Sequence, residues 1–305
     1  MDAPQLRYRR LLVPLLAWVF GLGQRQWIDG SYISVEMAFV ALGVYWCARL
    51  LARRGRSPVW GVLFVAVPAT LASFDRMLVD GALTALFAGF WLNCEEEKWG
   101  RVWVIAMLAS LTRETGLFLP AALIVDQLLR RNWRRAAWFA SSSLPALIWY
   151  GYLAEVLPRD GAYSVLTFPA WALLRRLFWL RPIALLDPRG RALVFVTDFL
   201  AVLGLIVSLV LAAIWLSKCR RGPVTLCVGF FAALTLILGA HIMIEPFAFG
   251  RPTSPLLLWL LVEAVSSQAW IALAPPLLVS LGVGVVFISP LWTVVKGVLG
   301  YRPPV

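Results

Sequence analysis

The sequence predicts an all-α membrane protein, a polytopic helical bundle with about ten transmembrane helices. Hydrophobic residues make up 61% of the 305 residues, the mean hydropathy is +0.80, and 14% of the residues are charged. Soluble domains are usually closer to half apolar. Long apolar runs recur from end to end, and runs such as FLAVLGLIVSLVLAAIWL do not alternate in the way that strands do.

The expected elements follow in chain order. RYRR and the apolar run after it are too short to span a bilayer, so residues 10–22 are expected to form a juxtamembrane helix. No internal repeat or linker interrupts the chain, which is expected to form a single integral-membrane domain, 1–305. The expected spanning helices are 31–52, 58–73, 78–94, 101–112, 115–130, 136–156, 192–217, 223–244, 252–268 and 270–289.

The one long hydrophilic loop, 157–191, contains FPAWALLRRLFWLRP. Helical spacing places Phe168, Trp171, Leu174 and Phe178 on one face of that segment, as is typical of a helix that lies in the membrane interface. In the helix before residue 94, Gly81, Ala85 and Gly89 form a stripe of small residues, which favours close helix packing.

Basic residues in alternate short loops predict the orientation, because arginine and lysine accumulate in cytoplasmic loops. This rule also explains the net charge of +12, so no nucleic-acid partner is expected. All four cysteines then lie near the cytoplasm, where thiols stay reduced. The predicted cytoplasmic set is Arg49, Arg53, Arg54, Arg56, Lys98, Arg101, Arg130, Arg131, Arg134, Arg135, Lys218, Arg220 and Arg221.

Several ionisable residues fall at the opposite, outer ends of the helices. Ionisable groups at membrane depth usually face one another or a cavity, so these residues indicate one outer-facing polar site. Arg76 and Asp80 are spaced to pair on one helix, and so are His241 and Glu245. Arg113 and Glu114 are adjacent, so each needs another partner or a turn between two helices.

Four segments resemble bacterial members of the GT-C glycosyltransferase superfamily, in the cell-surface glycopolymer branch. They are RYRRLLVPLLAWVFGLGQ, the stretch from Leu51 to Leu92, LASLTRETGLFLPAALI and FAFGRPTSPLLLWLL. The resemblance implies a polyprenyl-phosphate-linked sugar as donor, a glycan or protein as acceptor, and a site on the outer side of the bacterial inner membrane. The residues themselves predict no cofactor and no set of metal ligands, and they leave a need for a divalent metal open.

The resemblance also implies roles for the outer residues. Arginines suit the donor phosphate because the planar guanidinium forks around it, and a carboxylate is needed as general base. The phosphate-binding candidates are Arg113, Arg251, Arg9, Arg10 and Arg76. The substrate-binding candidates are Glu114, His241 and Glu245, and the stand-ins for the catalytic acid are Asp29, Asp75 and Asp80.

The chain departs from the family pattern at its start. Arg9, Arg10 and Pro14 match the family's juxtamembrane helix, whereas the helix and the acidic catalytic loop that normally precede it are missing. The alternatives to an active transferase are therefore an inactive, N-terminally truncated fragment, or a lipid or glycan transporter or flippase.

Overall fold

The computed structural model describes residues 7–157, 167–178, 188–219 and 221–285, and the regular elements in these ranges are helices. The all-α prediction is confirmed. The helices are α2 (Leu12–Phe20), α3 (Arg25–Arg53), α4 (Pro68–Arg76), α5 (Asp80–Glu95), α6 (Trp99–Thr112), α7 (Phe118–Leu129), α8 (Trp133–Ser141), α9 (Leu144–Val156), α10 (Trp171–Phe178), α11 (Pro188–Lys218), α12 (Pro223–Ile237) and α13 (Pro246–Ser267), with 3-10 helices η1 (Pro58–Ala66), η2 (Glu114–Leu117) and η3 (Trp270–Leu273).

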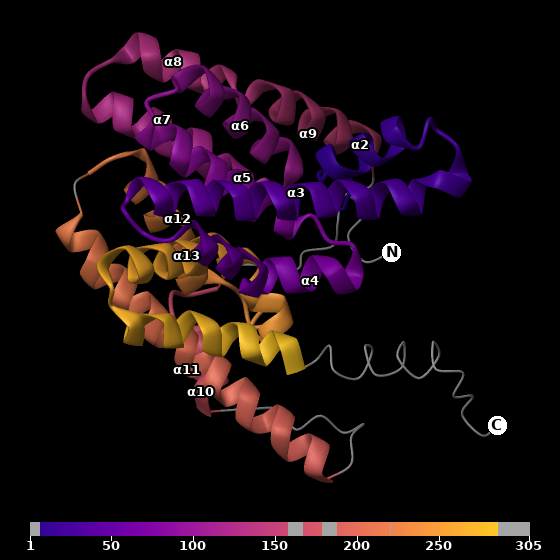
Figure 1. The fold of residues 1–305 in the computed structure, drawn as a ribbon. Helices are drawn as coiled ribbons and strands as arrows, with labels where there is room; N and C mark the ends of the chain where they lie inside the picture. The colour runs from indigo at the N-terminus through magenta and orange to yellow at the C-terminus, as the bar shows by residue number, and fades with distance from the viewer. Residues whose placement is uncertain (1–6, 158–166, 179–187, 220, 286–305) are drawn as a thin grey trace.

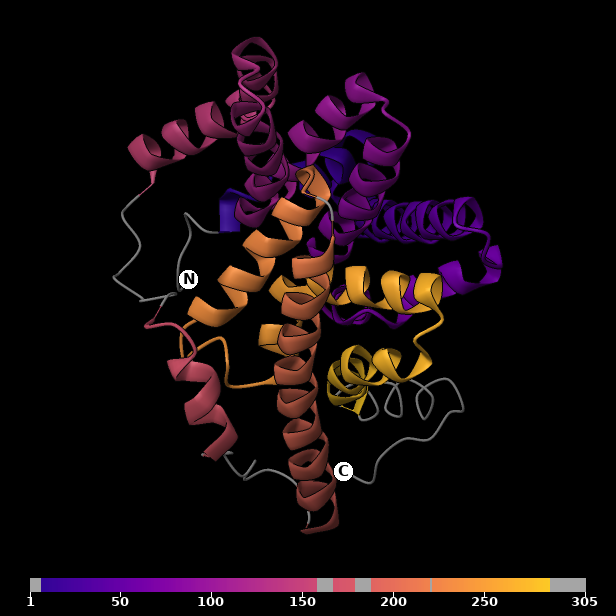
Figure 2. The same ribbon diagram turned by 90° about the vertical axis from the view of Figure 1, so that its left-hand side faces the viewer.

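Most helices run back and forth between two ends of the bundle. In Figure 1, α6 to α9 lie on one side of α3, and α11 to α13 lie on the other. Figure 2 shows that α11 extends beyond its neighbours, so the bundle is not a simple cylinder. Helix α5 forms the centre, because it packs against α3, α4, α6, α12 and α13.

The small-residue stripe of α5 allows this close packing, as predicted. A Cβ atom on Gly89 would lie 2.8 Å from the ring of Trp46 in α3, and one on Gly81 would lie 2.9 Å from the Ser73 hydroxyl oxygen in α4. Every residue from Asp80 to Cys94 is buried. Helix α5 can therefore approach α3 and α4 closely at its two glycines.

Prolines set several helix boundaries that the sequence analysis placed wrongly. The expected helix 58–73 is divided into η1 and α4, and Pro68 begins α4. The expected helix 136–156 is divided into α8 and α9, because Pro145 has no N–H to donate to the carbonyl of Ser141, where α8 ends. Helix α13 begins at Pro246, since proline suits the first turn of a helix.

Two helices in the described ranges are long and apolar enough to cross a membrane, Arg25–Arg53 and the part of α11 from Ala192 to Lys218. Shorter apolar helices cover Trp99–Thr112, Pro223–Ile237 and Trp270–Val285. The helical class is therefore established, while the predicted number of crossings stays a prediction. The expected juxtamembrane helix 10–22 corresponds to α2.

Helix α10 has the two faces that its sequence predicts. Within the helix, the exposed fractions are 58% for Trp171, 48% for Leu174 and 83% for Phe178. Phe168, three residues before the helix begins, is 79% exposed. On the opposite face Arg176 is buried and pairs with Asp198 of α11. The rest of the expected loop 157–191 lies largely outside the described residues, and α11 begins at Pro188.

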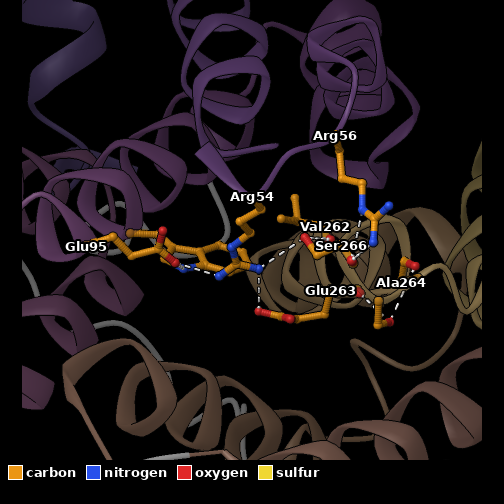
Figure 3. Close-up of polar contacts among 9 residues, drawn as sticks. Arg54, Arg56, Glu95, Val262, Glu263, Ala264 and Ser266 are labelled. Atoms are coloured by element: carbon orange, nitrogen blue, oxygen red, sulfur yellow. Dashed lines mark hydrogen bonds and ion pairs between the residues drawn. The ribbon is translucent and has the colours of Figure 1, made fainter. Parts of the chain in front are cut away.

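At one end of the bundle, Arg54 joins three helices (Figure 3). Its Nη2 lies 2.5 Å from Glu95 Oε1 of α5, and its Nη1 lies 2.9 Å from Glu263 Oε1 of α13. Arg56 donates two hydrogen bonds, of 3.0 and 2.8 Å, to the carbonyl of Ser266. We call Arg54, Glu95 and Glu263 the Arg54 clasp.

The same end contains much of the basic set that the orientation rule assigned to the cytoplasm. A cavity of about 670 Å³ here is lined by Arg54, Arg130 and Arg135 together with Cys219. In the α5–α6 turn, a hydrogen bond from Lys98 keeps the pKa of Glu96 below its ordinary value, and neighbouring arginines act in the same direction. Basic groups from several loops thus gather at one end, as their spacing predicts.

Candidate functional site

A second cluster of charged side chains lies at the other end of the bundle and is centred on Asp80, the first residue of α5. Its side chain is 1% exposed. The α4–α5 turn fixes its position: Met77 adopts a left-handed conformation, and the Gly81 N–H donates a 2.9 Å hydrogen bond to the Ser73 hydroxyl. The Ser73 hydroxyl in turn donates to the carbonyl of Leu78.

Arg113 reaches Asp80 from the junction of α6 and η2. Its backbone is extended, with φ −160° and ψ 156°, so α6 ends at Thr112. Its Nη1 pairs with Asp80 Oδ1, and its Nε lies 3.9 Å from Glu114 Oε2. The junction therefore turns Arg113 into the bundle, where its side chain is 13% exposed.

Arg251 approaches the same carboxylate from α13. Its Nη1 lies 3.8 Å from Asp80 Oδ2, and its Nε donates a 3.1 Å hydrogen bond to the carbonyl of Phe247. The guanidinium centre of Arg251 lies 4.6 Å from the centroid of the Phe247 ring, and that of Arg76 lies 4.3 Å from it. The ring thus holds two cations near Asp80 through its π face.

The basic segment before α2 supplies further cations. Leu11 N–H donates a 2.9 Å hydrogen bond to the carbonyl of Leu111, which fixes this segment against the end of α6. Arg9 lies over the ring of Tyr150, at 5.5 Å from its centroid. Arg10 lies within electrostatic range of Arg113 and Arg251.

The cluster has more buried donors than acceptors. The Nε atoms of Arg9, Arg10 and Arg113 are buried and have no hydrogen-bond partner among the described residues. The two carboxylate oxygens of Asp80 also have no hydrogen-bond partner there, and Arg113 and Arg251 approach them as ion-pair partners. A buried donor without an acceptor is costly, and an anion with several oxygens satisfies such donors. The cluster of Arg9, Arg10, Asp80, Arg113 and Arg251, which we call the cation cluster, therefore suits a phosphate group.

The structure brings together most of the predicted phosphate-binding residues and corrects one pairing. Arg76 and Asp80 do not share a helix, because α4 ends at Arg76 and α5 begins at Asp80. Asp80 pairs with Arg113 instead. Asp29 is exposed in the first turns of α3, away from the buried cluster. The side chain of Asp75 lies outside the described part of the structure.

His241 and Glu245 lie between α12 and α13, which corrects the expectation of a shared helical face. Helix α12 ends at Ile237 and α13 begins at Pro246, so the two residues are in turns. Both side chains are exposed. Glu245 lies within electrostatic range of Arg251, whereas Glu114, with an exposed fraction of 24%, lies directly beside Arg113.

Sequence reasoning missed the aromatic rings that hold the cations, Phe247 and Tyr150. The spacing of Phe247 and Arg251, four residues apart in one helix, was the available signal for one of them. Glu36 was expected on the outer side, on one helix face with Asp29, and was given no role. Its side chain is buried against Gly81, and its two carboxyl oxygens have no hydrogen-bond partner among the described residues. Gly81 comes from a distant part of the chain, so no local spacing reveals this contact.

No group of three or more His, Cys, Asp and Glu side chains is placed to hold a metal ion in the ranges that the structure describes. Comparisons of the chain with protein-family models, with curated proteins and with solved structures found no match.

Proposed function

We propose that the chain is a membrane-embedded glycosyltransferase of the GT-C type, which takes a sugar from a polyprenyl-phosphate donor on the outer side of the bacterial inner membrane. The observation that carries the proposal is the cation cluster. Two guanidinium groups from separate parts of the chain, those of Arg113 and Arg251, contact one fully buried carboxylate. Arg10, from a third part of the chain, lies within electrostatic range of both arginines.

In this proposal Arg113 and Arg10 bind the donor phosphate through N–H groups that have no acceptor in the described structure. Negative charge grows on the phosphate as it leaves the sugar. Fixed cations in a site that excludes water stabilise that charge more strongly than solvent does. Arg251 and Arg76, both held by the Phe247 ring, add positive potential from the side of α13.

Asp80 is proposed as a positioning residue and not as the general base. Arg113 and Arg251 approach its two carboxylate oxygens, which are the atoms that a general base uses to take a proton. Its proposed role is to hold Arg113 and Arg251 in the geometry that receives phosphate. Glu114 is proposed to bind a sugar hydroxyl, because its Oε1 is buried and has no hydrogen-bond partner among the described residues.

The reaction breaks the bond between the sugar C1 and the phosphate oxygen and forms a bond between C1 and a hydroxyl oxygen of the acceptor. The polyprenyl phosphate leaves with the bonding electrons, and a carboxylate accepts the hydroxyl proton. The acceptor is proposed to be a glycan or a protein of the cell envelope.

The membrane placement has its own support. Two described helices have the length and composition of spans, and the two sets of charged residues lie at opposite ends of the bundle. We propose that the Arg54 end faces the cytoplasm and the cation cluster faces the outside, in agreement with the positive-inside rule.

The test measures transfer and donor binding separately with the full chain in lipid nanodiscs. We expect Arg113→Ala to lower turnover by roughly 100- to 1,000-fold, the usual effect of removing one preorganised donor. Arg113→Lys is expected to restore part of the activity, because lysine keeps the positive charge but lacks the planar guanidinium that can donate two parallel hydrogen bonds. The control is Arg101→Ala, which removes an exposed arginine of α6.

Unchanged turnover in Arg113→Ala would remove the proposed role of this residue. Donor binding that depends on Arg113, without any transfer to the envelope acceptors tested, would instead favour a lipid-linked sugar transporter or flippase. A wild-type chain that neither binds nor transfers the donor would contradict the whole proposal.

A further inference from the structure

We propose that the turn between α7 and α8 binds the phosphate headgroup of an anionic glycerophospholipid in the cytoplasmic leaflet. This inference rests on the membrane placement in the proposed function and not on sugar transfer. The turn lies at the end of the bundle opposite the cation cluster, beside the cavity that Arg54, Arg130 and Arg135 line.

The turn carries four exposed arginines within six residues. Arg130 is neutralised by Asp126: its Nε lies 3.0 Å from Oδ2, and its Nη2 lies 3.1 Å from Oδ1. The other three, Arg131, Arg134 and Arg135, form no ion pair within the described part of the chain. Clusters of arginine directly outside the cytoplasmic end of a membrane helix attract anionic lipids.

The surrounding acids decide which of these arginines remain available to a lipid. Arg130 and Arg135 line the cavity together with Glu95, Glu97 and Asp126, so both face negative charge there. Arg131 and Arg134 are not among the residues that line it. We therefore assign the headgroup phosphate to Arg131 and Arg134.

The backbone of the turn is held in one conformation. Helix α7 ends at Leu129, and two residues later Arg131 lies in the left-handed region, at φ +57°. The N–H of Asn132 donates a 2.8 Å hydrogen bond to the carbonyl of Gln127. The Asn132 side chain then caps α8 by accepting a 3.2 Å hydrogen bond from the N–H of Arg135. The two arginines are thus presented by a rigid turn, which lowers the entropy lost on binding.

Helix α8 is anchored on its other face. Phe139 is buried against Trp99, with ring centroids 6.1 Å apart, and Trp103 donates a 3.0 Å hydrogen bond from its indole nitrogen to the carbonyl of Trp138. The basic face of α8 therefore cannot turn inward without breaking these contacts.

Large apolar side chains flank the arginines and favour lipid over nucleic acid. Leu129 is 64% exposed and Trp133 is 68% exposed. Tryptophan is enriched where a protein meets the bilayer surface, because its ring is apolar and its N–H is polar. An exposed leucine beside this tryptophan makes no favourable contact with the phosphate backbone of a nucleic acid. The same leucine can pack on the glycerol and upper acyl chain of a lipid.

The experiment compares two variants of the full chain that lose the same charge. In detergent micelles, native mass spectrometry measures the competition between phosphatidylglycerol and phosphatidylcholine for each protein. Arg131→Gln/Arg134→Gln is expected to lower the preference for phosphatidylglycerol by about 30-fold, about fivefold for each arginine. The control, Arg25→Gln/Arg101→Gln, removes two other exposed arginines and is expected to keep the preference.

A second measurement needs no arginine variant. Brominated phosphatidylglycerol in nanodiscs is expected to quench tryptophan fluorescence more in the wild-type chain than in Trp133→Phe, and brominated phosphatidylcholine is expected to show no such difference. The proposal is overturned if both double variants lose the preference for phosphatidylglycerol equally, or if the two brominated lipids give the same quenching. It is likewise overturned if an RNA oligonucleotide binds more strongly than the lipid. It is also overturned if soluble glycerol phosphate displaces the lipid completely at equal concentration, since that result assigns the site to free phosphate.

The two proposals can fail separately. A chain that stays in solution without detergent contradicts the membrane placement and both proposals with it. A chain that transfers sugar but shows no preference for phosphatidylglycerol contradicts the lipid site alone.

Discussion

Gly116 decides how Arg113 enters the bundle. A Cβ atom on Gly116 would lie 1.8 Å from the carbonyl oxygen of Ala109, so only glycine lets η2 fold back against the end of α6. The motif TRETG thus contains both the cation and the residue that positions it. The sequence indicates a turn here, but it does not show which backbone atom the glycine approaches.

Gly116→Ala is therefore expected to lower the free energy of unfolding by about 3 kcal/mol, because the added methyl group forces the junction apart. Chemical denaturation of the purified chain measures the change. Gly100→Ala is the matched control: nothing lies within 4 Å of its added Cβ, and it occupies the first turn of α6. Equal stability of the two variants would contradict the close approach.

Asp80 is the one carboxylate that contacts both Arg113 and Arg251 in the described structure. Asp80→Asn removes the one carboxylate that contacts both of these arginines, and we expect a loss of about 3 kcal/mol in the free energy of unfolding. Asp29→Asn, at an exposed position of α3, is expected to change the stability by less than about 0.5 kcal/mol. A stable Asp80→Asn protein would show that another group neutralises the arginines.

At the scale of the helices, the sequence predicts the elements better than their ends. The length of the hydrophobic runs predicted where the apolar helices lie. Pro68 and Pro145 each divide a segment that had been expected to form a single helix. Proline removes one hydrogen bond of the helix, but it does not break every helix. In α13, Pro252 and Pro255 lie inside one continuous helix.

The Arg54 clasp joins α3, α5 and α13, and no local pattern predicts it. Arg54→Ala is expected to lower the free energy of unfolding by about 2 kcal/mol, because Glu95 and Glu263 lose a partly buried cation. The control is Arg53→Ala: Arg53 is 46% exposed and lies 3.4 Å from Glu96, and removal of such a surface pair is expected to change the stability by less than about 1 kcal/mol. Thermal unfolding in one detergent compares the two, and equal losses would contradict a special role for the clasp.

At the scale of the whole molecule, the sorting of charges was predictable and their pairing was not. The basic loops and the outer charges alternate along the sequence. Because the helices run back and forth, these two kinds of charge lie at opposite ends of the bundle. The partners, such as Asp80 for Arg113 and Arg176 for Asp198, come from other helices, and only the packing of the bundle selects them.

The orientation can be tested with the native thiols. Cys219 is exposed, whereas Cys47, Cys94 and Cys227 are buried. A maleimide that cannot cross membranes is expected to leave Cys219 unlabelled in cells whose outer face alone is accessible and to label it in inside-out vesicles. Asp29→Cys, at the opposite end of the bundle, is expected to show the reverse pattern. Labelling of Cys219 from the outside would invert the proposed topology.

The Arg54 clasp also imposes an order on biosynthesis. Glu95 follows Arg54 by 41 residues in the chain, whereas Glu263 follows it by 209 residues. At ~5–20 residues per second, the ribosome needs roughly 10 to 40 s to make the longer stretch. During that interval Glu95 is the only one of the two carboxylates that can neutralise Arg54. The Arg54 clasp therefore forms in two stages, and the contact that ties α13 to α3 becomes possible only near the end of synthesis.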